Sequence, residues 1–394
     1  MRRSSVLLLL GLTVSACAEP GAPVPVAEDA PVLEPMAADV ATPIPGQYIV
    51  VYKDDAPARP EGITNLVADG DARMVYEYRS ALNGTVLRGV DDAELAALRA
   101  DPAVAYVEQD QVMHTSATQT GATWGLDRID QRNRPLSTAY TYTATGLGVR
   151  AYILDTGIRF SHVDFGGRAI PGFDAIGDGL AGNDCNGHGT HVAGTVGGTT
   201  WGVAKQVTLI AVRVLNCAGA GTTSGIIAGV DWVRANHVKP AVANMSLGGG
   251  ASTALDAAVT NAIAAGVTFV LAAGNSNIDA CGVSPARTGP AITVGATTST
   301  DVRASYSNFG SCLDLFAPGS SITSAWITSN TSTASIDGTS MASPHVAGVA
   351  AKLLQVTPTA SPATIRNAIV TNATLSKVSS AGSGSPNRLL FTNN

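Results

Sequence analysis

The sequence predicts an α/β domain with a mostly parallel sheet at residues 117–394, preceded by a small α+β domain at residues 47–116. In the longer part, short apolar runs bounded by Gly, Asn or Asp alternate with helical segments, which is the order of buried parallel strands and their crossover helices. In the shorter part, β-prone runs flank a helix that starts on acidic residues. Hydrophobic residues make up 45% of the chain and charged residues 14%, so an intrinsically disordered chain is excluded.

The first 46 residues have the features of an export segment. Two arginines, a short apolar core and small residues predict a signal peptide at residues 1–16. Cys17 follows Val14-Ser15-Ala16 as in a bacterial lipobox, where the cysteine receives a lipid. The alternative is an ordinary signal peptide followed by an incidental cysteine. Residues 17–46 hold seven of the twenty prolines, which predicts an extended linker.

Three segments predict the small domain at residues 47–116. Tyr48–Tyr52 and Val104–Glu108 are β-prone, and Asp91–Leu98 begins with acidic residues that favour the start of a helix. Residues 114–121 are small and polar, so we expect an exposed connector between this domain and the next.

The larger domain contains five apolar runs of strand length and several helical segments. We expect strands at Val149–Leu154, Val207–Leu215, Ala241–Met245, Val267–Ala272 and Ala291–Val294. We expect helices at Thr190–Val196, Thr223–Asn236 and Thr253–Ala265. A further long apolar helix is expected to open at Ser340, with Pro344 in its first turn, where a missing N–H costs little.

The formal net charge is -6 and is unevenly distributed along the chain. Residues 47–116 carry 12 acidic against 6 basic side chains, whereas residues 117–394 carry 13 acidic against 16 basic ones. The two parts could attract each other, although two independently solvated surfaces explain the same pattern. No dense Lys/Arg block occurs, so nucleic-acid binding has no support.

Three polar residues lie where an open parallel sheet places its ligand site, beyond the carboxyl ends of the strands. Asp155 follows an apolar strand, His188 opens a helix of small residues, and Ser340 opens a long apolar helix. A serine hydroxyl becomes a strong nucleophile when an imidazole removes its proton, and a carboxylate orients that imidazole. The order Asp, His, Ser along the chain is one known order of this triad.

Each of these residues also has a simpler explanation when taken alone. Asp155 could be a turn residue, and Ser340 could be a helix cap. His188 and His191 have metal-pair spacing, but the His-Glu-x-x-His motif of zinc proteases is absent. The esterase elbow G-x-S-x-G is absent around Ser340, and no dinucleotide fingerprint follows the first strand of the larger domain. A catalytically silent binding protein on the same fold is a further alternative.

The segments around the three residues resemble the signature segments of the subtilisin-like serine proteases. They are Asp155-Thr156-Gly157, the run from His188 to Gly194, and the run from Gly338 to Gly348. The similarity extends from about Thr123 to Leu390 and is greatest to the proteinase K branch, especially aqualysin-like bacterial enzymes. It implies a subtilisin-like fold and a secreted serine endopeptidase that acts on proteins and peptides as a monomer.

The resemblance also implies residues that bind the substrate and the developing oxyanion. Asn275 matches the family's oxyanion-hole asparagine. Gly219-Ala220-Gly221 and Ser246-Leu247-Gly248 resemble the two segments that pair with the substrate backbone. Ala272-Ala273-Gly274 would line a roomy first specificity pocket, which favours apolar or small P1 residues over basic ones.

Residues 47–116 resemble the inhibitory propeptide of this family. The resemblance implies that this domain binds its own protease as an intramolecular inhibitor and is removed by a cut near Ser116/Ala117. A permanent accessory domain is the alternative. Because Cys17 precedes the cut, a lipid on it would anchor the precursor to the membrane only transiently.

The five cysteines suggest disulfide bonds in an exported protein once Cys17 is set aside. Four cysteines allow three pairings, and the resemblance selects Cys185 with Cys217 and Cys281 with Cys312. Each bond would close a loop of roughly 30 residues and contribute about 3–4 kcal/mol.

The resemblance also implies structural calcium and no catalytic cofactor. Asp314 matches the carboxylate ligand of the family's strong site, with carbonyl groups from Gly289 and Ala291. The residues that resemble a second site are Asp127, Asp130, Gln131 and Ser137. A third site is expected at Asp174 and Asp178. Ordinary turn and cap carboxylates are the alternative at all three places.

Overall fold

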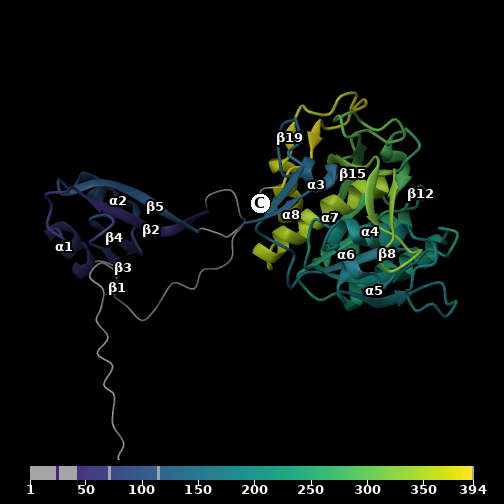
Figure 1. The fold of residues 1–394 in the computed structure, drawn as a ribbon, viewed down its shortest axis with the longest axis horizontal. Coiled ribbons are helices and arrows are strands. Elements are labelled where there is room, and N and C mark those ends of the chain that lie inside the picture. Colours follow the sequence, from purple (N-terminus) through teal and green to yellow (C-terminus); the bar gives the residue numbers. More distant parts are fainter. Residues whose placement is uncertain (1–23, 26–41, 70–71, 113–115, 393–394) are drawn as a thin grey trace, which may run out of the picture. The chain divides into compact units, whose positions relative to one another are not determined.

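The structure is a computed structural model and describes residues 24–25, 42–69, 72–112 and 116–392. These residues form two compact units, one ending at Val112 and the other starting at Ser116 (Figure 1). The predicted signal peptide and Cys17 lie outside the described residues. Within the described ranges, no helix combines the length and the apolar character that crossing a bilayer requires.

The N-terminal unit is an antiparallel five-stranded sheet with the order β1-β3-β4-β2-β5. Its elements are β1 (Val24–Pro25), β2 (Thr42–Tyr52), α1 (Glu61–Asp69), β3 (Arg73–Tyr78), β4 (Gly84–Arg88), α2 (Asp92–Ala100) and β5 (Val104–Val112). The predicted helix is confirmed, and it starts because Asp91 and Glu94 form reciprocal capping hydrogen bonds of 2.8 and 2.9 Å.

The predicted linker is shorter than expected at its C-terminal end. Strand β2 begins at Thr42, five residues before the predicted domain start, and pairs Thr42 with Val112 and Pro43 with Gln111. The pairing with β5 is irregular between Pro43 and Tyr48, a stretch that contains Pro45, which has no N–H to donate to a ladder hydrogen bond.

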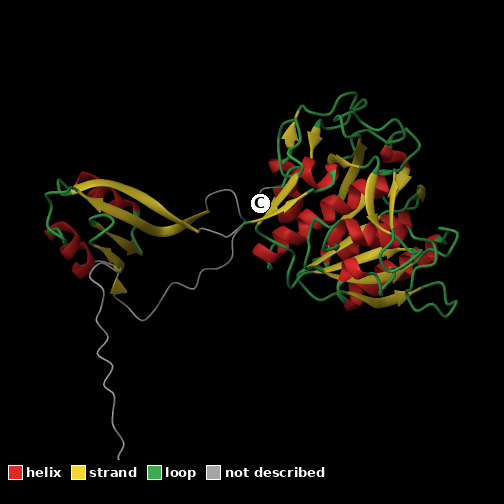
Figure 2. Cartoon of the chain, in the orientation of Figure 1, coloured by secondary structure: helices red, strands yellow, loops and turns green. Residues whose placement is uncertain are grey.

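The C-terminal unit contains a nine-stranded sheet with the order β19-β20-β16-β15-β13-β11-β8-β10-β9. Figure 2 shows the strands of this unit lying among its helices. Neighbouring strands from β9 to β20 pair in parallel, and β19 pairs antiparallel with β20. Its strands are β8 (Arg150–Asp155), β9 (Ala169–Asp174), β10 (Thr208–Arg213), β11 (Ala241–Met245), β13 (Thr268–Ala272), β15 (Ile292–Thr297), β16 (Leu315–Pro318), β19 (Thr374–Leu375) and β20 (Arg388–Leu389).

Three two-stranded ribbons surround this sheet: β6 (Ala117–Thr120) with β7 (Ala139–Tyr142), β12 (Gly249–Gly250) with β14 (Val283–Ser284), and β17 (Ile322–Ala325) with β18 (Thr333–Ile336). The connector expected at residues 114–121 contains a strand, because residues 117–120 are held by backbone pairing to β7. The helices of this unit are α3 (Trp124–Ile129), α4 (His188–Gly197), α5 (Thr223–Asn236), α6 (Thr253–Ala264), α7 (Thr339–Val356) and α8 (Pro362–Asn372).

Helices cover both faces of the parallel sheet, which explains why its strands are apolar throughout. In β8, Ala151 and Ile153 pack with the residues of α4, α7 and α8, while Tyr152 and Leu154 pack with those of α5 and α6. Successive side chains of a strand point to opposite faces, so a strand buried on both sides needs apolar residues at every position. The five predicted strands and three predicted helices are confirmed, with ends shifted by no more than three residues.

Candidate active site

Asp155 is the last residue of β8, and the alternation of the strand decides which way it faces. Because Ala151 and Ile153 face the helices α4 and α7, Asp155 points to that same side. Its side chain is fully buried, and its Oδ1 accepts a hydrogen bond of 2.8 Å from the backbone N–H of Thr156.

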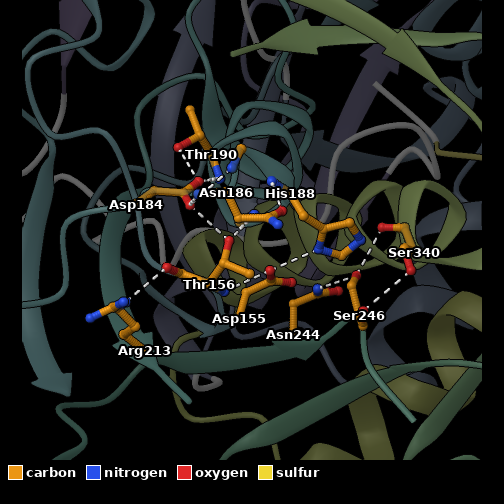
Figure 3. Close-up of polar contacts among 12 residues, drawn as sticks. Asp155, Thr156, Asp184, Asn186, His188, Thr190, Arg213, Asn244, Ser246 and Ser340 are labelled. Carbon is orange, nitrogen blue, oxygen red and sulfur yellow. Dashed lines mark hydrogen bonds and ion pairs between the residues drawn. The ribbon is translucent and has the colours of Figure 1, made fainter. Parts of the chain in front are cut away.

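His188 is the first residue of α4, and its ring lies beside Asp155. The distance from His188 Nδ1 to Asp155 Oδ1 is 2.7 Å (Figure 3). Burial alone would lower the pKa of His188, but the charge and hydrogen bond of Asp155, with a smaller contribution from Asp184, raise it above its ordinary value. The imidazole is therefore held by a carboxylate at one nitrogen.

Ser340 is the second residue of α7. Its hydroxyl donates to the carbonyl oxygen of Ser246 at 3.2 Å, and Figure 3 shows the side chains of Ser340 and His188 pointing toward each other. The side chain lies at the N-terminus of an 18-residue helix, where backbone N–H groups lack intrahelical partners.

Pro344 lies in the second turn of α7, not in the first turn as predicted, because the helix begins at Thr339. Proline has no N–H to donate to the carbonyl four residues earlier, which belongs to Ser340. The Ser246 hydroxyl donates to that carbonyl instead, at 2.8 Å. Asn244 donates to Ser246 Oγ and accepts from Ser343 Oγ, so a buried chain of hydrogen bonds replaces the missing helical one.

Asn275 follows β13 after a turn, and the oxygen of its side-chain amide holds it in place. Its Oδ1 accepts from the backbone N–H and the hydroxyl of Thr339, both at 2.8 Å. The NH₂ side of the amide is thereby directed away from Thr339, and Asn275 lines the cavity next to Ser340. The sequence did not point to Thr339 as a site residue. Its contact with Asn275 in the structure is the reason to include it, because it orients the Asn275 amide.

Two cavities of about 230 and 360 Å³ flank these residues. The smaller is lined by Leu247, Gly248, Ala272, Ala273 and Gly274, and also by the unpredicted Val283, Ala286 and Asn308. The larger is lined by Gly219, Ala220, Gly221, Ser246, Leu247 and Gly248. Each of the nine predicted substrate-binding residues thus lines at least one of the two cavities, and no acid is found among the described residues around the smaller one.

Both predicted cysteine pairs form disulfide bonds, Cys185–Cys217 and Cys281–Cys312. The first bond joins the loop that precedes His188 to the loop that contains Gly219. Asn186 Nδ2 reinforces this junction by donating to the carbonyl oxygen of Cys217 at 3.0 Å.

At the predicted third calcium site, both carboxylates contact a guanidinium group. Arg213 Nη1 contacts Asp174 Oδ2 at 3.0 Å and Asp178 Oδ1 at 2.5 Å, and Arg213 Nη2 contacts Asp178 Oδ2 at 2.7 Å. These contacts lower the pKa of Asp178 to about 2. A calcium ion there would be repelled by the arginine charge.

At the other two predicted calcium sites, neighbouring groups compensate only part of the negative charge of the carboxylates. Asp314 accepts from the Thr293 N–H at 2.8 Å and pairs with Arg366 at 2.5 Å, yet burial keeps its pKa raised. Burial, and the nearby charge of Asp127, raise the pKa of Asp130 to about 6 despite a hydrogen bond from Thr141. An added cation would stabilise the charged form of both groups.

Three of the remaining predicted ligands, Asp127, Gln131 and Ser137, already have hydrogen-bond partners. The N–H and the hydroxyl of Ser137 both donate to Asp127, and the Gln131 carbonyl accepts from Arg128. Gly289 and Ala291 lie in the loop before β15. Among the described residues, no group of three or more His, Cys, Asp or Glu side chains is close enough to hold a metal.

Comparisons with known proteins agree with this geometry. A family model for the Subtilase family matches residues 146–389, and one for peptidase inhibitor I9 matches residues 47–116. An extracellular serine proteinase of Thermus sp. (strain Rt41A) is 56% identical over 100% of both chains. Alkaline serine exoprotease A of Vibrio alginolyticus is 56% identical over 76% of this chain and 57% of its own length.

The fold has a close counterpart among solved structures. A cold adapted subtilisin-like serine proteinase matches 69% of this chain and 99% of its own with a TM-score of 0.68 and 56% identity. The chain therefore belongs to the subtilase family of serine proteinases and carries an I9-type inhibitor propeptide ahead of its peptidase domain.

Proposed function

We propose that this protein is a secreted serine endopeptidase in which Ser340 is the nucleophile, His188 the general base and Asp155 the residue that orients His188. The 2.7 Å contact between His188 Nδ1 and Asp155 Oδ1 carries this proposal. It holds the proton on Nδ1 and leaves Nε2 as an acceptor for the serine proton.

In the proposed reaction, the Ser340 hydroxyl leaves the Ser246 carbonyl and donates its proton to His188 Nε2 as Oγ attacks the substrate carbonyl. Asn275 Nδ2 and the backbone N–H of Ser340 stabilise the oxyanion that develops. His188 then donates the proton to the leaving amine. In the second half of the reaction, His188 takes a proton from water as the water oxygen attacks the acyl carbon, and returns it to Ser340 Oγ as the bond to the acyl group breaks. The chemistry requires no catalytic cofactor.

Substrate binding is proposed to use both cavities. An extended peptide would add a strand between Gly219-Ala220-Gly221 and Ser246-Leu247-Gly248. The P1 side chain would enter the smaller cavity, whose walls include Ala272, Ala273 and Ala286. Because these walls are small and uncharged, we propose broad specificity with apolar or small P1 residues.

The test of this function is hydrolysis of casein by the purified mature protein, with and without a serine-directed fluorophosphonate. We expect hydrolysis that the reagent abolishes, and a mass increase of one phosphonyl group on the peptide that contains Ser340. Modification at another residue, or hydrolysis that persists after complete modification, would contradict the assignment.

Maturation and location are further parts of the proposal. The I9 domain would inhibit the enzyme until self-cleavage near Ser116/Ala117 separates it, and the mature enzyme would act outside the cell as a monomer. The extracellular Thermus relative supports this location. Lipidation of Cys17 stays a prediction. The expected product is a chain beginning near Ala117, identified by N-terminal sequencing of the active species.

Calcium is proposed as a structural ion, at Asp314 with the Gly289 and Ala291 carbonyls and at Asp130 with its neighbours. An ion that binds only the folded state raises the free energy of unfolding. Exhaustive chelation should therefore lower the Tm by roughly 5–10 °C. Calorimetry with and without chelator measures this shift, and Asp314→Asn should make it smaller. An unchanged Tm after chelation would contradict the calcium proposal.

A further inference from the structure

Asp184 lies four residues before His188 and accepts hydrogen bonds from three separate parts of the chain. Its Oδ1 accepts from the Thr156 hydroxyl at 2.9 Å and from the N–H groups of Asn186 and Gly187 at 2.9 and 3.0 Å. Its Oδ2 accepts from the N–H and hydroxyl of Thr190 at 2.9 and 2.6 Å. Figure 3 shows this carboxylate among the three groups of donors.

These donors lie on both sides of the contact between Asp155 and His188. Thr156 follows Asp155 directly, and its N–H donates to Asp155. Its hydroxyl also accepts from the N–H of Gly189, the residue after His188, at 2.9 Å. Asp184 thus connects the end of β8 with the residues before and after His188.

The residues after β8 and the start of α4 lie so close together that neither backbone segment can shift toward the other. A Cβ atom on Gly189 would lie 2.2 Å from the carbonyl oxygen of Gly157. Gly187, the residue at the start of α4, has no side chain to cap the helix, and Asp184 supplies the capping oxygens from outside it. A simple helix cap needs one such bond, whereas Asp184 accepts five.

We propose that Asp184 is a positioning residue that locks the His188 loop against the end of β8 and places a second negative charge behind the imidazole. The proposal rests on the proposed function of Asp155, His188 and Ser340. It assigns a role in catalysis to a residue that touches no reacting atom and that the sequence reasoning did not single out.

The charged groups around His188 favour this role. Asp155 and Asp184 are the anions that raise its pKa. His191, one turn further along α4, has its pKa lowered to about 4 by burial, so it adds no charge near neutral pH. Arg213 is engaged by Asp174 and Asp178. Removing the charge of Asp184 should therefore lower the pKa of His188.

The test compares Asp184→Asn with wild type by kcat and by the pH profile of kcat/KM on a peptide p-nitroanilide with an apolar P1 residue. Rates are normalised by active-site titration. Asparagine keeps the shape of the side chain but removes its charge and places an NH₂ group opposite the Thr190 N–H. We expect kcat to fall about 10-fold to 100-fold. The acidic limb should move to lower pH by about half a unit to one unit.

A matched control is Asp301→Asn, which removes the charge of a carboxylate that is buried, paired with Arg128 at 2.7 Å and absent from the lining of both cavities. It should lower the Tm without moving the acidic limb. Asp184→Asn that lowers only the Tm, with kcat and the acidic limb unchanged, would reduce Asp184 to a structural cap and overturn the proposal.

If Asp184→Asn does not fold, a second pair of variants tests whether Asp184 positions the His188 loop. Thr156→Val removes the hydroxyl that donates to Asp184 but keeps the Asp184 charge, whereas Thr156→Ser keeps the hydroxyl. We expect Thr156→Val to have the lower kcat with no shift of the acidic limb, and equal kcat values would overturn the proposal. Activity that survives in Ser340→Ala would instead contradict the proposed function itself, so the two failures are distinguishable.

Discussion

The Ser340→Ala variant is expected to lose about 10⁶-fold in kcat, the size of loss that removal of this nucleophile causes in subtilisin, a member of the same family. In the proposed mechanism, alanine removes the only atom of this side chain that can form the acyl-enzyme, while the proposed oxyanion donors and substrate contacts remain. The precursor should therefore accumulate uncut. Intact mass measures the cut, and turnover of a peptide p-nitroanilide measures the activity.

The fold of this variant should be intact, because Ser340 Oγ makes one hydrogen bond of 3.2 Å to a carbonyl group. A suitable control is Ser361→Ala, which removes the serine that caps α8 by accepting from the Thr364 N–H. It should cost about 1 kcal/mol of stability and leave activity and maturation unchanged. Normal maturation of Ser340→Ala would contradict the assignment of the nucleophile.

The Asp155→Asn variant should reduce kcat about 10⁴-fold with little change in the backbone. An asparagine amide can donate to His188 Nδ1, which moves the imidazole proton to Nε2. That nitrogen can then no longer accept the proton of Ser340. The rate of precursor cleavage and the turnover of the matured enzyme both measure the loss.

The pH profile of the same variant has a defined direction. Asp155 raises the pKa of His188, and only the neutral imidazole acts as a base. Removing the carboxylate charge lowers this pKa, so the acidic limb of the remaining activity should move to lower pH. A variant within tenfold of wild-type kcat, or a limb that moves to higher pH, would show that Asp155 does not orient His188.

The sequence alone predicted the two-domain order, the parallel sheet and the residues proposed for catalysis. These features are local: strands buried on both faces are apolar at every position, and Asp155, His188 and Ser340 each stand at the end of a strand or the start of a helix. A short stretch of residues carries each signal, and the family resemblance supplied the pairing of the four cysteines.

The tertiary structure decided which partner each remaining polar group has. Asp174 meets Arg213 because β9 lies beside β10 in the sheet and pairs these two residues in register. The sequence shows both residues but not the order of the strands. Likewise, Ser246 donates to Ser340 and Thr156 to Asp184 only because segments distant in the sequence meet at one edge of the sheet. A carboxylate, hydroxyl or amide can form hydrogen bonds with many different groups. Which group it contacts, and therefore what it does, is decided by the fold that brings the two together.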